Sequence, residues 1–337
     1  MLFDEITSLK MERDEAREEL ENLRKLKTTH SLSAERVKED NQKCNMMTGL
    51  SWDVFLTVFT YLSTFLPKPR KESIPQDEQL FITLVRLRHN TSFDFLAHAR
   101  GLKKATLVNY FWKWIDLIGT KMNFLIKWPS SEVAFETNPI VFRKKFPRLT
   151  SIVDCFEIFV EKPKGLLAKA QCYSQYKRHA TVKVFISCTP LGKINFISKA
   201  WGGRASDINI VKGSGFISSS LHRPGDQILA DRGFTLQKDF AAVCNAHLIT
   251  PAFTRRRAQL SARDVEYSRK ISSVRIHIER VIGLLKRRFT ILHGPIPIRS
   301  IKSIKDEVNQ APLANVDKIV NACAILCNLG EGIVYKD

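Results

Sequence analysis

Hydrophobic and polar residues recur along this chain with two different periods, and the period changes near Phe146. Before that residue, apolar positions are spaced as in helices. The run SWDVFLTVFTYLSTFL, from Ser51 to Leu66, predicts a helix that packs on a core. After Phe146, short runs rich in Ile, Val and Phe are separated by turn residues, which predicts strands. We therefore expect a helical part followed by an α/β part.

Residues 1–45 predict a charged helix or a short coiled coil. Residues 1–40 hold eight Lys/Arg and eleven Asp/Glu, and the apolar positions are few and irregularly spaced: Ile6, Leu9, Leu20, Leu23 and Leu26. A partner helix is an alternative reading of this segment. After the helix from Ser51, the breaker PKPRKESIP predicts a linker whose basic cluster fits either a solvated loop or a nuclear localisation signal.

Residues 50–130 predict a helical domain that contains a helix-turn-helix. Ala97, Gly101 and Leu107 supply the small residue, the turn glycine and the buried apolar residue that such a motif requires. The start of its second helix is where DNA is contacted, and it carries four polar candidates: Lys103, Lys104, Thr106 and Asn109. An ordinary three-helix bundle is the alternative.

Residues 148–330 predict a mixed α/β sheet. The expected strands are the runs LTSIVDCFEIFVEKP, TVKVFISCTP, KINFISKAW, DQILADRGF and HLITPAF. Helices are expected at about residues 206–219 and 236–245. Strands that follow these later helices are expected to pair in parallel, because each helix provides a crossover connection.

Two carboxylates stand out in this sheet. Asp154 lies in the middle of IVDCFEIFV, among apolar residues, where a carboxylate is costly unless it is paired, hydrogen-bonded or bound to a metal. Asp231 ends the run ILADRGF, where it fits either a polar turn or a site outside the carboxyl end of a strand. If the first and fourth strands are neighbours, the two carboxylates face the same place.

The long helix expected after the sheet offers a third carboxylate. Its buried stripe is Val274, Ile278, Val281, Leu285 and Phe289. A second face contains Arg275, Glu279, Gly283 and Lys286, and Gly283 would allow another backbone to approach. Glu279 is either a site residue or one half of a surface pair with Arg275.

The chain has a net charge of +19, and the positive excess lies outside residues 1–40. A body this basic is expected to bind polyanions, nucleic acid first, with an anionic membrane surface as the weaker alternative. Double-stranded DNA is the expected partner. No long uncharged apolar run is present, so no membrane span or signal peptide is expected. The seven cysteines form no CxxC pair and predict a reducing compartment. Cys323 and Cys327 are interpreted as small buried residues rather than half of a metal site.

Six segments of the chain, taken in order, are similar to those of a known protein family: IVDCFEIFVEKP, YSQYKRHATVKVFI, SKAWGGRASD, ILADRGF, SRKISSVRIHIERVIGLLKRRF and NACAILCNL. Together they resemble the DDE superfamily endonuclease domain of Harbinger-like transposases of animals. The segment from about Pro75 to Leu117 resembles the helix-turn-helix that precedes this domain. The resemblance covers most of residues 75–330.

This resemblance implies an RNase H-like fold with an acidic triad that matches Asp154, Asp231 and Glu279. It also implies a metal-dependent DNA endonuclease or transposase that uses Mg²⁺, with Mn²⁺ as a substitute. Asp207 matches a further acidic position, and it either contributes to the metal site or caps the helix that begins there. A homo-oligomer, a separate DNA-binding protein partner and a nuclear location are further expectations.

Residues 254–288 hold eleven Lys/Arg and three Asp/Glu, so this segment is expected to follow the DNA backbone. The residues chosen for that role are Arg255, Arg256, Arg257, Lys286, Arg287 and Arg288. Two other functions remain open. One is a domesticated DNA-binding or adaptor protein that keeps the fold without transposition, and the other is a coiled-coil interaction protein.

Overall fold

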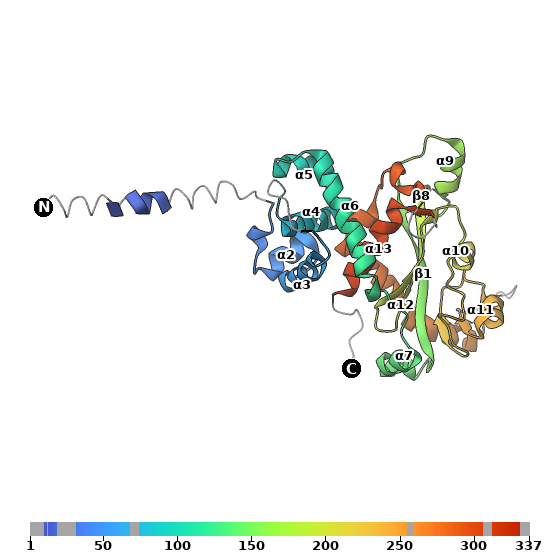
Figure 1. Ribbon diagram of the computed structural model, residues 1–337. Coiled ribbons are helices and arrows are strands. Elements are labelled where there is room, and N and C mark those ends of the chain that lie inside the picture. Colours follow the sequence, from blue (N-terminus) through green and yellow to red (C-terminus); the bar gives the residue numbers. More distant parts are fainter. Residues whose placement is uncertain are drawn as a thin grey trace. The chain divides into compact units, whose positions relative to one another are not determined.

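The structure is a computed structural model that describes residues 10–11, 13–18, 32–67, 74–254, 259–305 and 312–330. Its chain divides into two units (Figure 1). Unit 1 contains residues 1–86 and 91–112, and unit 2 contains residues 87–90 and 113–337.

The described elements of unit 1 are helices. They are η1 (Glu35–Val37), α2 (Asn41–Thr48), α3 (Trp52–Ser63), α4 (Gln76–His89), α5 (Phe93–Arg100) and α6 (Lys104–Lys121), and the ends of α4 and α6 belong to unit 2. The helix expected from Ser51 is present as α3. The hydroxyl of Ser51 caps it by accepting a hydrogen bond from the backbone N–H of Val54. Phe55, Val58 and Leu62 face the core of this unit.

The tight turn expected between α5 and α6 is also present. Gly101 ends α5 with a left-handed φ of 61°, a conformation that favours glycine. Ala97 and Leu107 are buried on the two sides of this turn. The guanidinium of Arg86 lies 4.1 Å from the ring centre of Phe93 and fixes α5 against α4. The helix-turn-helix interpretation is therefore confirmed at the residues that predicted it.

The segment before α2 is part of the packed core of unit 1. The backbone N–H of Ala34 donates to the Glu78 carboxylate at 2.9 Å, and Arg100 forms an ion pair with the same carboxylate at 3.0 Å. Burial raises the pKa of Glu78, while Arg100 opposes that rise. The boundary expected at residue 45 falls inside α2.

Residues 10–11 and 13–18 are helical, as expected for the charged amino-terminal segment. The apolar positions on which the coiled-coil expectation rests, Ile6, Leu9, Leu20, Leu23 and Leu26, lie outside the described residues. The same holds for most of the basic cluster at residues 67–71.

Unit 2 is built on one mixed sheet. Its strands are β1 (Leu149–Phe159), β2 (Tyr173–Ser174), β3 (His179–Cys188), β4 (Ile194–Ile197), β5 (Trp201–Gly202), β6 (Gln227–Leu229) and β7 (His247–Ile249). The order is β2-β3-β1-β6-β7, with β4 and β5 also paired to β3. β1 is antiparallel to β3 and parallel to β6, and β6 is parallel to β7. This arrangement confirms the expected RNase H-like mixed sheet.

The remaining elements of unit 2 surround this sheet. They are η2 (Asn123–Leu125), α7 (Ser131–Thr137), α8 (Ile140–Arg143), α9 (Leu166–Cys172), α10 (Asp207–Gly213), α11 (Gln237–Cys244), α12 (Ala262–Arg288), η3 (Thr290–His293), η4 (Ile298–Ile301), the hairpin β8 (Ser303–Lys305) and β9 (Pro312–Ala314), and α13 (Asn315–Asn328). Figure 1 draws α12 and α13 on one side of β1, and α10 and α11 on the other.

Three strand expectations differ from the structure. The run expected at residues 193–201 is divided into β4 and β5. The run that ends in ILADRGF is a strand only to Leu229, because Asp231 starts a turn in which its carbonyl accepts from the N–H of Phe234 at 3.1 Å. The connection between β1 and β3 holds α9 and β2, which the apolar pattern did not indicate because this segment is rich in polar and basic residues.

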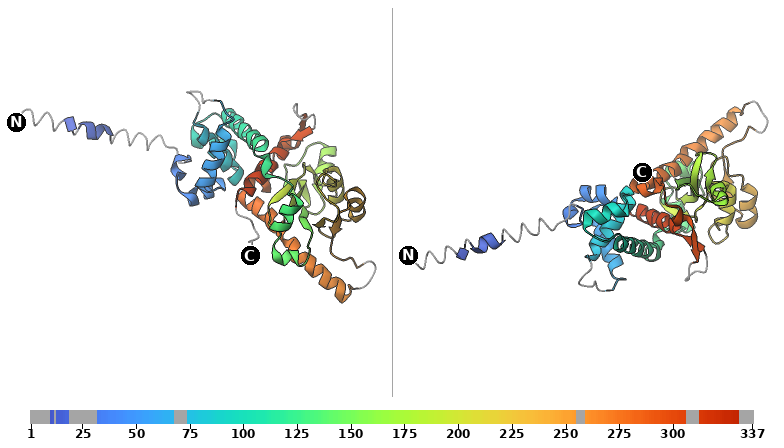
Figure 2. Two further views of the ribbon diagram at one scale, coloured as in Figure 1. Left: turned by 60° about the horizontal axis from the view of Figure 1, so that its bottom comes forward. Right: turned by 90° about the horizontal axis from the view of Figure 1, so that it is seen from above.

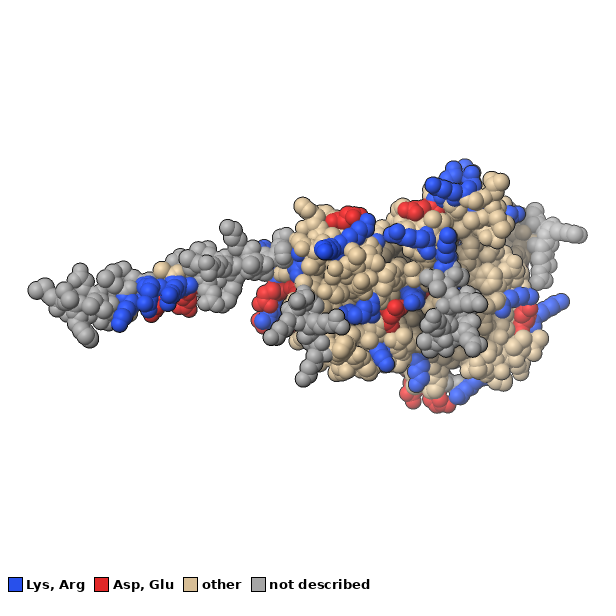
Figure 3. All heavy atoms as spheres, turned by 45° about the horizontal axis from the view of Figure 1, so that its top comes forward, with Lys and Arg blue, Asp and Glu red and all other residues tan. Residues whose placement is uncertain are grey.

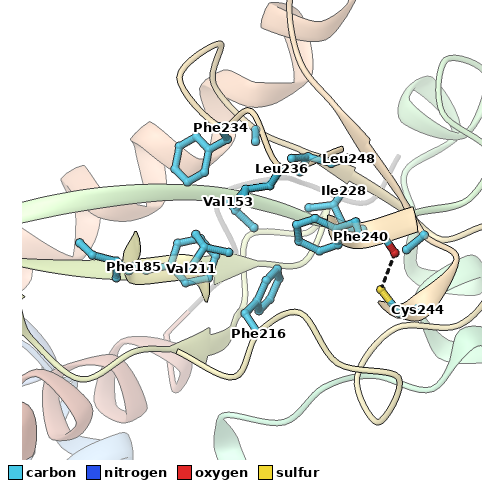
Figure 4. Packing of buried hydrophobic residues seen from close by; sticks show 13 residues of the cluster. Val153, Phe185, Val211, Phe216, Ile228, Phe234, Leu236, Phe240, Cys244 and Leu248 are labelled. Atoms are coloured by element: carbon cyan, nitrogen blue, oxygen red, sulfur yellow. Dashed lines mark hydrogen bonds between the residues drawn. The ribbon is translucent and has the colours of Figure 1, made fainter. Parts of the chain in front are cut away.

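One apolar core cluster of unit 2 lies on the α10 and α11 side of the sheet. Val153 of β1 and Ile228 of β6 pack there against the rings of Phe185, Phe216 and Phe240 (Figure 4). Residues of β1 alternate between faces, so Ile152 and Asp154 point to the other side, where α12 packs. The sheet therefore separates an apolar face from a face that carries a carboxylate.

The long helix α12 confirms the buried stripe expected from the sequence. Its buried residues are Ile271, Val274, His277, Ile278, Val281 and Leu285. In both views of Figure 2 the first turns of α12, drawn in orange, project beyond the sheet, in agreement with the exposure of most residues before Ile271.

Cys323 and Cys327 are buried on α13 and behave as small core residues, as expected. All seven cysteines are free thiols. In the part of the chain that the structure describes, no helix combines the length and the apolar character that crossing a bilayer demands.

Candidate active site

Two neighbouring parallel strands position Asp154 and Asp231. The register pairs Ile152 of β1 with Leu229 of β6, and each Asp follows its paired residue by two positions. Side chains two residues apart on a strand point to the same face, so both carboxylates leave the sheet on the side of α12. Asp231 lies just past the end of β6, where sites form outside the carboxyl ends of parallel strands.

Glu279 reaches the same place from α12. The buried residues Ile278 and Val281 turn one side of this helix toward the core, and Glu279 lies at the edge of that side with 53% of its side chain exposed. A helix residue at this edge can contact the neighbouring strands and solvent together. The late helix thus brings the third predicted carboxylate to the two strand carboxylates.

The guanidinium of Arg275 joins the three carboxylates. It lies 2.9 Å from an oxygen of Glu279, 3.6 Å from one of Asp154 and 3.7 Å from one of Asp231. The side chain of Arg275 is only 18% exposed, whereas Asp231 and Glu279 are about half exposed. Three carboxylates from two strands and a helix therefore converge on one cation at the surface of the sheet domain.

Asp154 is the most buried member of this cluster. Burial raises its pKa to about 6, although a hydrogen bond from the backbone N–H of Cys155 and the charge of Arg275 act in the opposite direction. The charge of Asp231 adds to the rise. A carboxylate with a raised pKa gains more than an exposed one from an added positive charge.

The cluster has the chemistry of a divalent-cation site, but its present arrangement is an ion-pair network. Carboxylate oxygens are the donors that Mg²⁺ and Mn²⁺ prefer. Among the described residues, however, no group of three or more His, Cys, Asp or Glu side chains is arranged to hold a metal ion directly. The place where the three carboxylates converge is held by Arg275, so a metal ion would have to replace its guanidinium.

Asp207 does not contact Arg275, although its negative charge adds to the rise in the pKa of Asp154. It lies on α10 and forms an ion pair with Lys183 of β3 at 3.0 Å. Lys183 pairs in register with Glu157, which points to the same face as Val153 and Cys155, opposite to Asp154. The expectation that Asp207 caps its helix is wrong, because the cap is Ser206, whose hydroxyl accepts from the N–H of Asn209. A contribution of Asp207 to a metal site stays a prediction.

No described backbone approaches α12 at Gly283, where a Cβ atom added to the glycine would meet nothing within 4 Å. Lys286 points inward, since its ammonium donates to the carbonyl of Glu157 and lies 5.5 Å from the ring centre of Phe156. Burial lowers the pKa of Lys286. Because its ammonium group is engaged inside the fold, Lys286 is poorly placed to contact a DNA phosphate.

Arg288 also points inward, and its guanidinium donates to the carbonyl of Cys327 at 3.3 Å. Arg287 is exposed. The remaining basic residues chosen from this region, Arg255, Arg256 and Arg257, lie outside the described residues.

The polar candidates of the helix-turn-helix are placed at the start of α6, as expected. Lys103 and Asn109 are exposed, and Thr106 is half-buried. Lys104 is exposed as well, and its ammonium forms an ion pair with Asp94 of α5 at 2.7 Å. An exposed pair of this kind contributes little to stability, so Lys104 can exchange it for a phosphate at small cost.

Sequence reasoning did not identify Arg275 as the partner of all three carboxylates. The spacing of Arg275 and Glu279 indicated only an i,i+4 surface pair, and that pair is indeed the shortest of the three contacts. The contacts with Asp154 and Asp231 join residues more than 40 positions apart, for which the chain offers no local signal.

Comparisons with known proteins identify the family to which the chain belongs. Residues 153–328 match the DDE superfamily endonuclease, and residues 73–124 match the helix-turn-helix of DDE superfamily endonuclease. Neither the curated proteins nor the solved structures contain a match. The endonuclease match covers about half of the chain and includes Asp154, Asp231 and Glu279. The order of the two matches is that of a transposase-like nuclease, and the chain belongs to the DDE superfamily endonucleases.

Proposed function

We propose that this protein is a metal-dependent DNA endonuclease of the transposase type, in which Asp154, Asp231 and Glu279 are the catalytic carboxylates. The observation that supports this most is their convergence on a single guanidinium, within 4 Å of it in each case. Three carboxylates repel one another unless a cation lies between them, so the fold is built to hold positive charge at this place.

The three carboxylates would hold Mg²⁺, or Mn²⁺ as a substitute. When bound, such ions activate a water molecule or a 3′-hydroxyl and stabilise the charge on the 3′-oxygen that leaves the phosphodiester. Asp154 provides a rigid ligand, since its strand is central in the sheet. Asp231 and Glu279 are more exposed and leave the open side of the cluster accessible to a DNA phosphate.

Arg275 has two roles in this proposal. Before metal binding, its charge offsets the repulsion among the carboxylates and keeps them together. With a metal ion bound by the carboxylates, the guanidinium of Arg275 would be available to bind phosphate oxygens, for which Arg is well suited.

DNA binding is assigned first to the helix-turn-helix. Lys103 and Lys104 lie at the start of α6, where phosphates are contacted, and Thr106 and Asn109 lie one turn further along the helix, where base edges are contacted. Replacing Lys103 and Lys104 with Ala should lower the salt dependence of duplex binding by about one unit for each lost phosphate contact.

Nicking of supercoiled plasmid DNA tests the catalytic proposal, because it requires no knowledge of the recognised sequence. The wild-type protein should nick the plasmid with Mg²⁺ or Mn²⁺. Asp154→Asn, Asp231→Asn and Glu279→Gln should each reduce the rate by about a thousandfold or more, because an amide is a poor ligand for a hard cation. Glu266→Gln, an exposed position on the same helix, is the matched control and should leave the rate unchanged.

Plasmid binding by the same variants separates the two main functions. If the three carboxylates are catalytic, the triad variants should bind DNA about as well as the wild-type protein but should not nick it. Full nicking by any one triad variant would contradict its assignment. Binding without nicking by the wild-type protein would instead support a DNA-binding or adaptor protein that keeps the fold.

A further inference from the structure

The connection between β1 and β3 forms a basic lobe, defined here as residues 162–179 and called the α9 lobe. It contains α9 and β2. Residues 162–206 include nine Lys/Arg and no Asp or Glu. Five of the nine cations are in the lobe: Lys162, Lys164, Lys169, Lys177 and Arg178.

The five cations of the α9 lobe are exposed, and none forms an ion pair with a described residue. Two carboxylates beside the lobe are already engaged, because Glu157 accepts hydrogen bonds from the hydroxyls of Ser174 at 3.0 Å and Thr181 at 2.7 Å, and Glu161 accepts one from the N–H of Ile298 at 3.1 Å. Figure 3 shows that Lys and Arg outnumber Asp and Glu over the face of the protein that it draws. The positive charge of the lobe is therefore available to an external anion.

Large apolar side chains lie among these cations and are also exposed. The exposed fraction is 84% for Leu166, 73% for Leu167, 84% for Tyr176 and 46% for Tyr173. The ammonium of Lys177 lies 4.7 Å from the ring centre of Tyr176, which leaves most of that ring open to solvent. A surface with unpaired cations around exposed rings fits a ligand that carries both phosphates and flat bases.

The α9 lobe is fixed to the sheet rather than loosely attached. The backbone of Gln171 and Cys172 packs so closely on Gly202 and Gly203 that an added Cβ atom would lie 2.4 Å from the carbonyl oxygen of Gln171 and 2.8 Å from that of Cys172. The N–H of Arg204 donates to the carbonyl of Gln171 at 3.1 Å. The lobe therefore presents its exposed residues in a defined position.

A hollow on the lobe has a suitable size and lining. It measures about 400 Å³ and is lined by Leu166, Lys169, Ala170, Tyr173, Gln175 and Arg204. Two cations and one tyrosine ring at the edges of this hollow can contact a phosphate and a base or sugar of the same strand. This volume is sufficient for part of a nucleotide and too small for a folded partner segment.

We propose that the α9 lobe is a second DNA-binding surface, which holds the DNA that flanks the cleaved bond. This inference rests on the proposed function. Asp154 lies five residues before the end of β1, from which the lobe starts. At a rise of about 3.3 Å per residue, the end of β1 lies about 17 Å from Asp154, and the lobe begins three residues further along the chain, at Lys162. That distance corresponds to about five base pairs at 3.4 Å each.

DNA fits the lobe better than the other occupants of a basic and apolar surface. Two copies of the lobe would bring like charges together, which opposes self-association through this surface. An anionic membrane would satisfy the cations and the leucines, but unit 2 belongs to an endonuclease family, whose substrate is a nucleic acid. The membrane and the second copy are therefore alternative outcomes of the test.

The test measures binding of a fluorescent duplex by anisotropy, with EDTA present so that no cleavage occurs. The lobe variant is Lys164→Ala, Lys169→Ala and Lys177→Ala together. The matched control removes three exposed lysines elsewhere in unit 2: Lys127→Ala, Lys144→Ala and Lys238→Ala. Melting temperatures of both variants should equal that of the wild-type protein, because exposed lysines contribute little to folding.

The lobe variant should bind at least about tenfold more weakly than the control variant. The slope of log affinity against log salt concentration should fall by about two to three units, or about 0.9 for each lost phosphate contact. Tyr176→Ala should weaken binding of a duplex with unpaired flanking bases by about tenfold and should affect a fully paired duplex less.

Equal affinity and equal slope in the lobe and control variants would overturn the inference. A lobe variant that binds DNA normally but no longer binds vesicles of anionic lipids, which the wild-type protein binds, would also overturn it. The same holds for a lobe variant whose oligomeric state in light scattering changes while its DNA binding does not. Because binding is measured in EDTA, failure of the lobe inference and failure of the catalytic proposal give different results. If the wild-type protein binds DNA through the lobe and fails to nick plasmid, the lobe inference stands and the nuclease assignment fails.

Discussion

The two faces of the unit 2 sheet are built from alternate residues of the same strands, yet they differ in almost every physical respect. On the α10 and α11 face, Val153 and Ile228 are buried among phenylalanine rings. On the α12 face, Asp154 and Asp231 share the guanidinium of Arg275 with Glu279. Both faces bury apolar side chains, but only the α12 face combines them with the three carboxylates around Arg275.

The comparison shows how one sheet can support a charged cluster. Burial of apolar side chains supplies most of the stability of a fold, whereas a cluster of like charges opposes it. Successive side chains of a strand point to opposite faces of the sheet. Val153 of β1 therefore packs in the apolar core, while Asp154, the next residue, lies in the acidic cluster on the other face. The apolar face is thus expected to control stability, and the charged face is expected to control activity.

The largest effect on stability is expected from Phe216→Ala on the apolar face. Phe216 is fully buried, and its ring contacts Phe185, Phe196 and Phe240. Removing it should lower the free energy of unfolding by about 3–5 kcal/mol. Chemical denaturation measures the change, with the exposed Val243→Ala on α11 as a control expected to change it by less than about 0.5 kcal/mol. Similar losses from both variants would contradict the packing of this face.

His222 provides a pH test of the same face. It is buried beside Trp128 and Phe216, and burial lowers its pKa to about 4. Its pKa is near 6.5 when unfolded, so the unfolded state binds the proton first as pH falls. Stability from neutral His222 is complete above about pH 6.5 and is lost toward pH 4, by up to about 3 kcal/mol.

Denaturation curves between pH 4 and pH 7.5 measure this loss. His222→Phe keeps an aromatic ring in the cluster but cannot take up a proton, so its stability should change less over this range than that of the wild-type protein. Parallel curves for the two proteins would show that His222 does not titrate on unfolding.

The next effect concerns Arg275 on the charged face. Arg275→Ala should lower stability in EDTA by about 1–2 kcal/mol, because three carboxylates then lack their cation. The value is small since Asp231 and Glu279 are about half exposed and screened by water. The same variant should gain more from Mg²⁺ or Ca²⁺ than the wild-type protein, because the metal ion no longer has to displace a guanidinium.

Thermal unfolding with and without the divalent ion measures this gain without any reliance on cleavage. Arg275→Lys keeps one positive charge but only a single nitrogen, so its response should lie between those of the wild-type protein and Arg275→Ala. An identical increase in melting temperature in all three proteins would show that Arg275 does not compete with the metal ion.

The smallest effect is expected at Gly283, on the helix that covers the charged face. Its backbone is helical, and an added Cβ atom would meet nothing within 4 Å. Gly283→Ala should therefore raise the free energy of unfolding by about 0.5–1 kcal/mol, because alanine has the higher helix propensity. A lower stability would indicate that another molecule or segment approaches this position. The measurement thus also tests whether the open side of α12 is free.

Much of this protein can be predicted from its sequence, because local periodicity and chain order have direct structural consequences. The alternation in IVDCFEIFV predicts β1 and puts Asp154 mid-strand. The stripe from Val274 to Leu285 predicts which side of α12 is buried. Ala97, Gly101 and Leu107 predict the turn of the helix-turn-helix. In each case neighbouring residues decide the outcome, either through a repeat of 2 or 3.6 residues or through the backbone freedom of glycine.

The tertiary structure decided which side-chain ends meet and which remain in solvent. Lys286 and Arg288 belong to a strongly basic stretch, yet their ends reach the carbonyls of Glu157 and Cys327. The cations of the α9 lobe received no role from the sequence, and the structure shows that they are exposed. The partners of Arg275 were also decided by tertiary packing, because β1, the end of β6 and α12 come from distant parts of the chain and together place it among three carboxylates. Charge and spacing are properties of the chain, whereas the partner of a long side chain depends on long-range packing that no local pattern records.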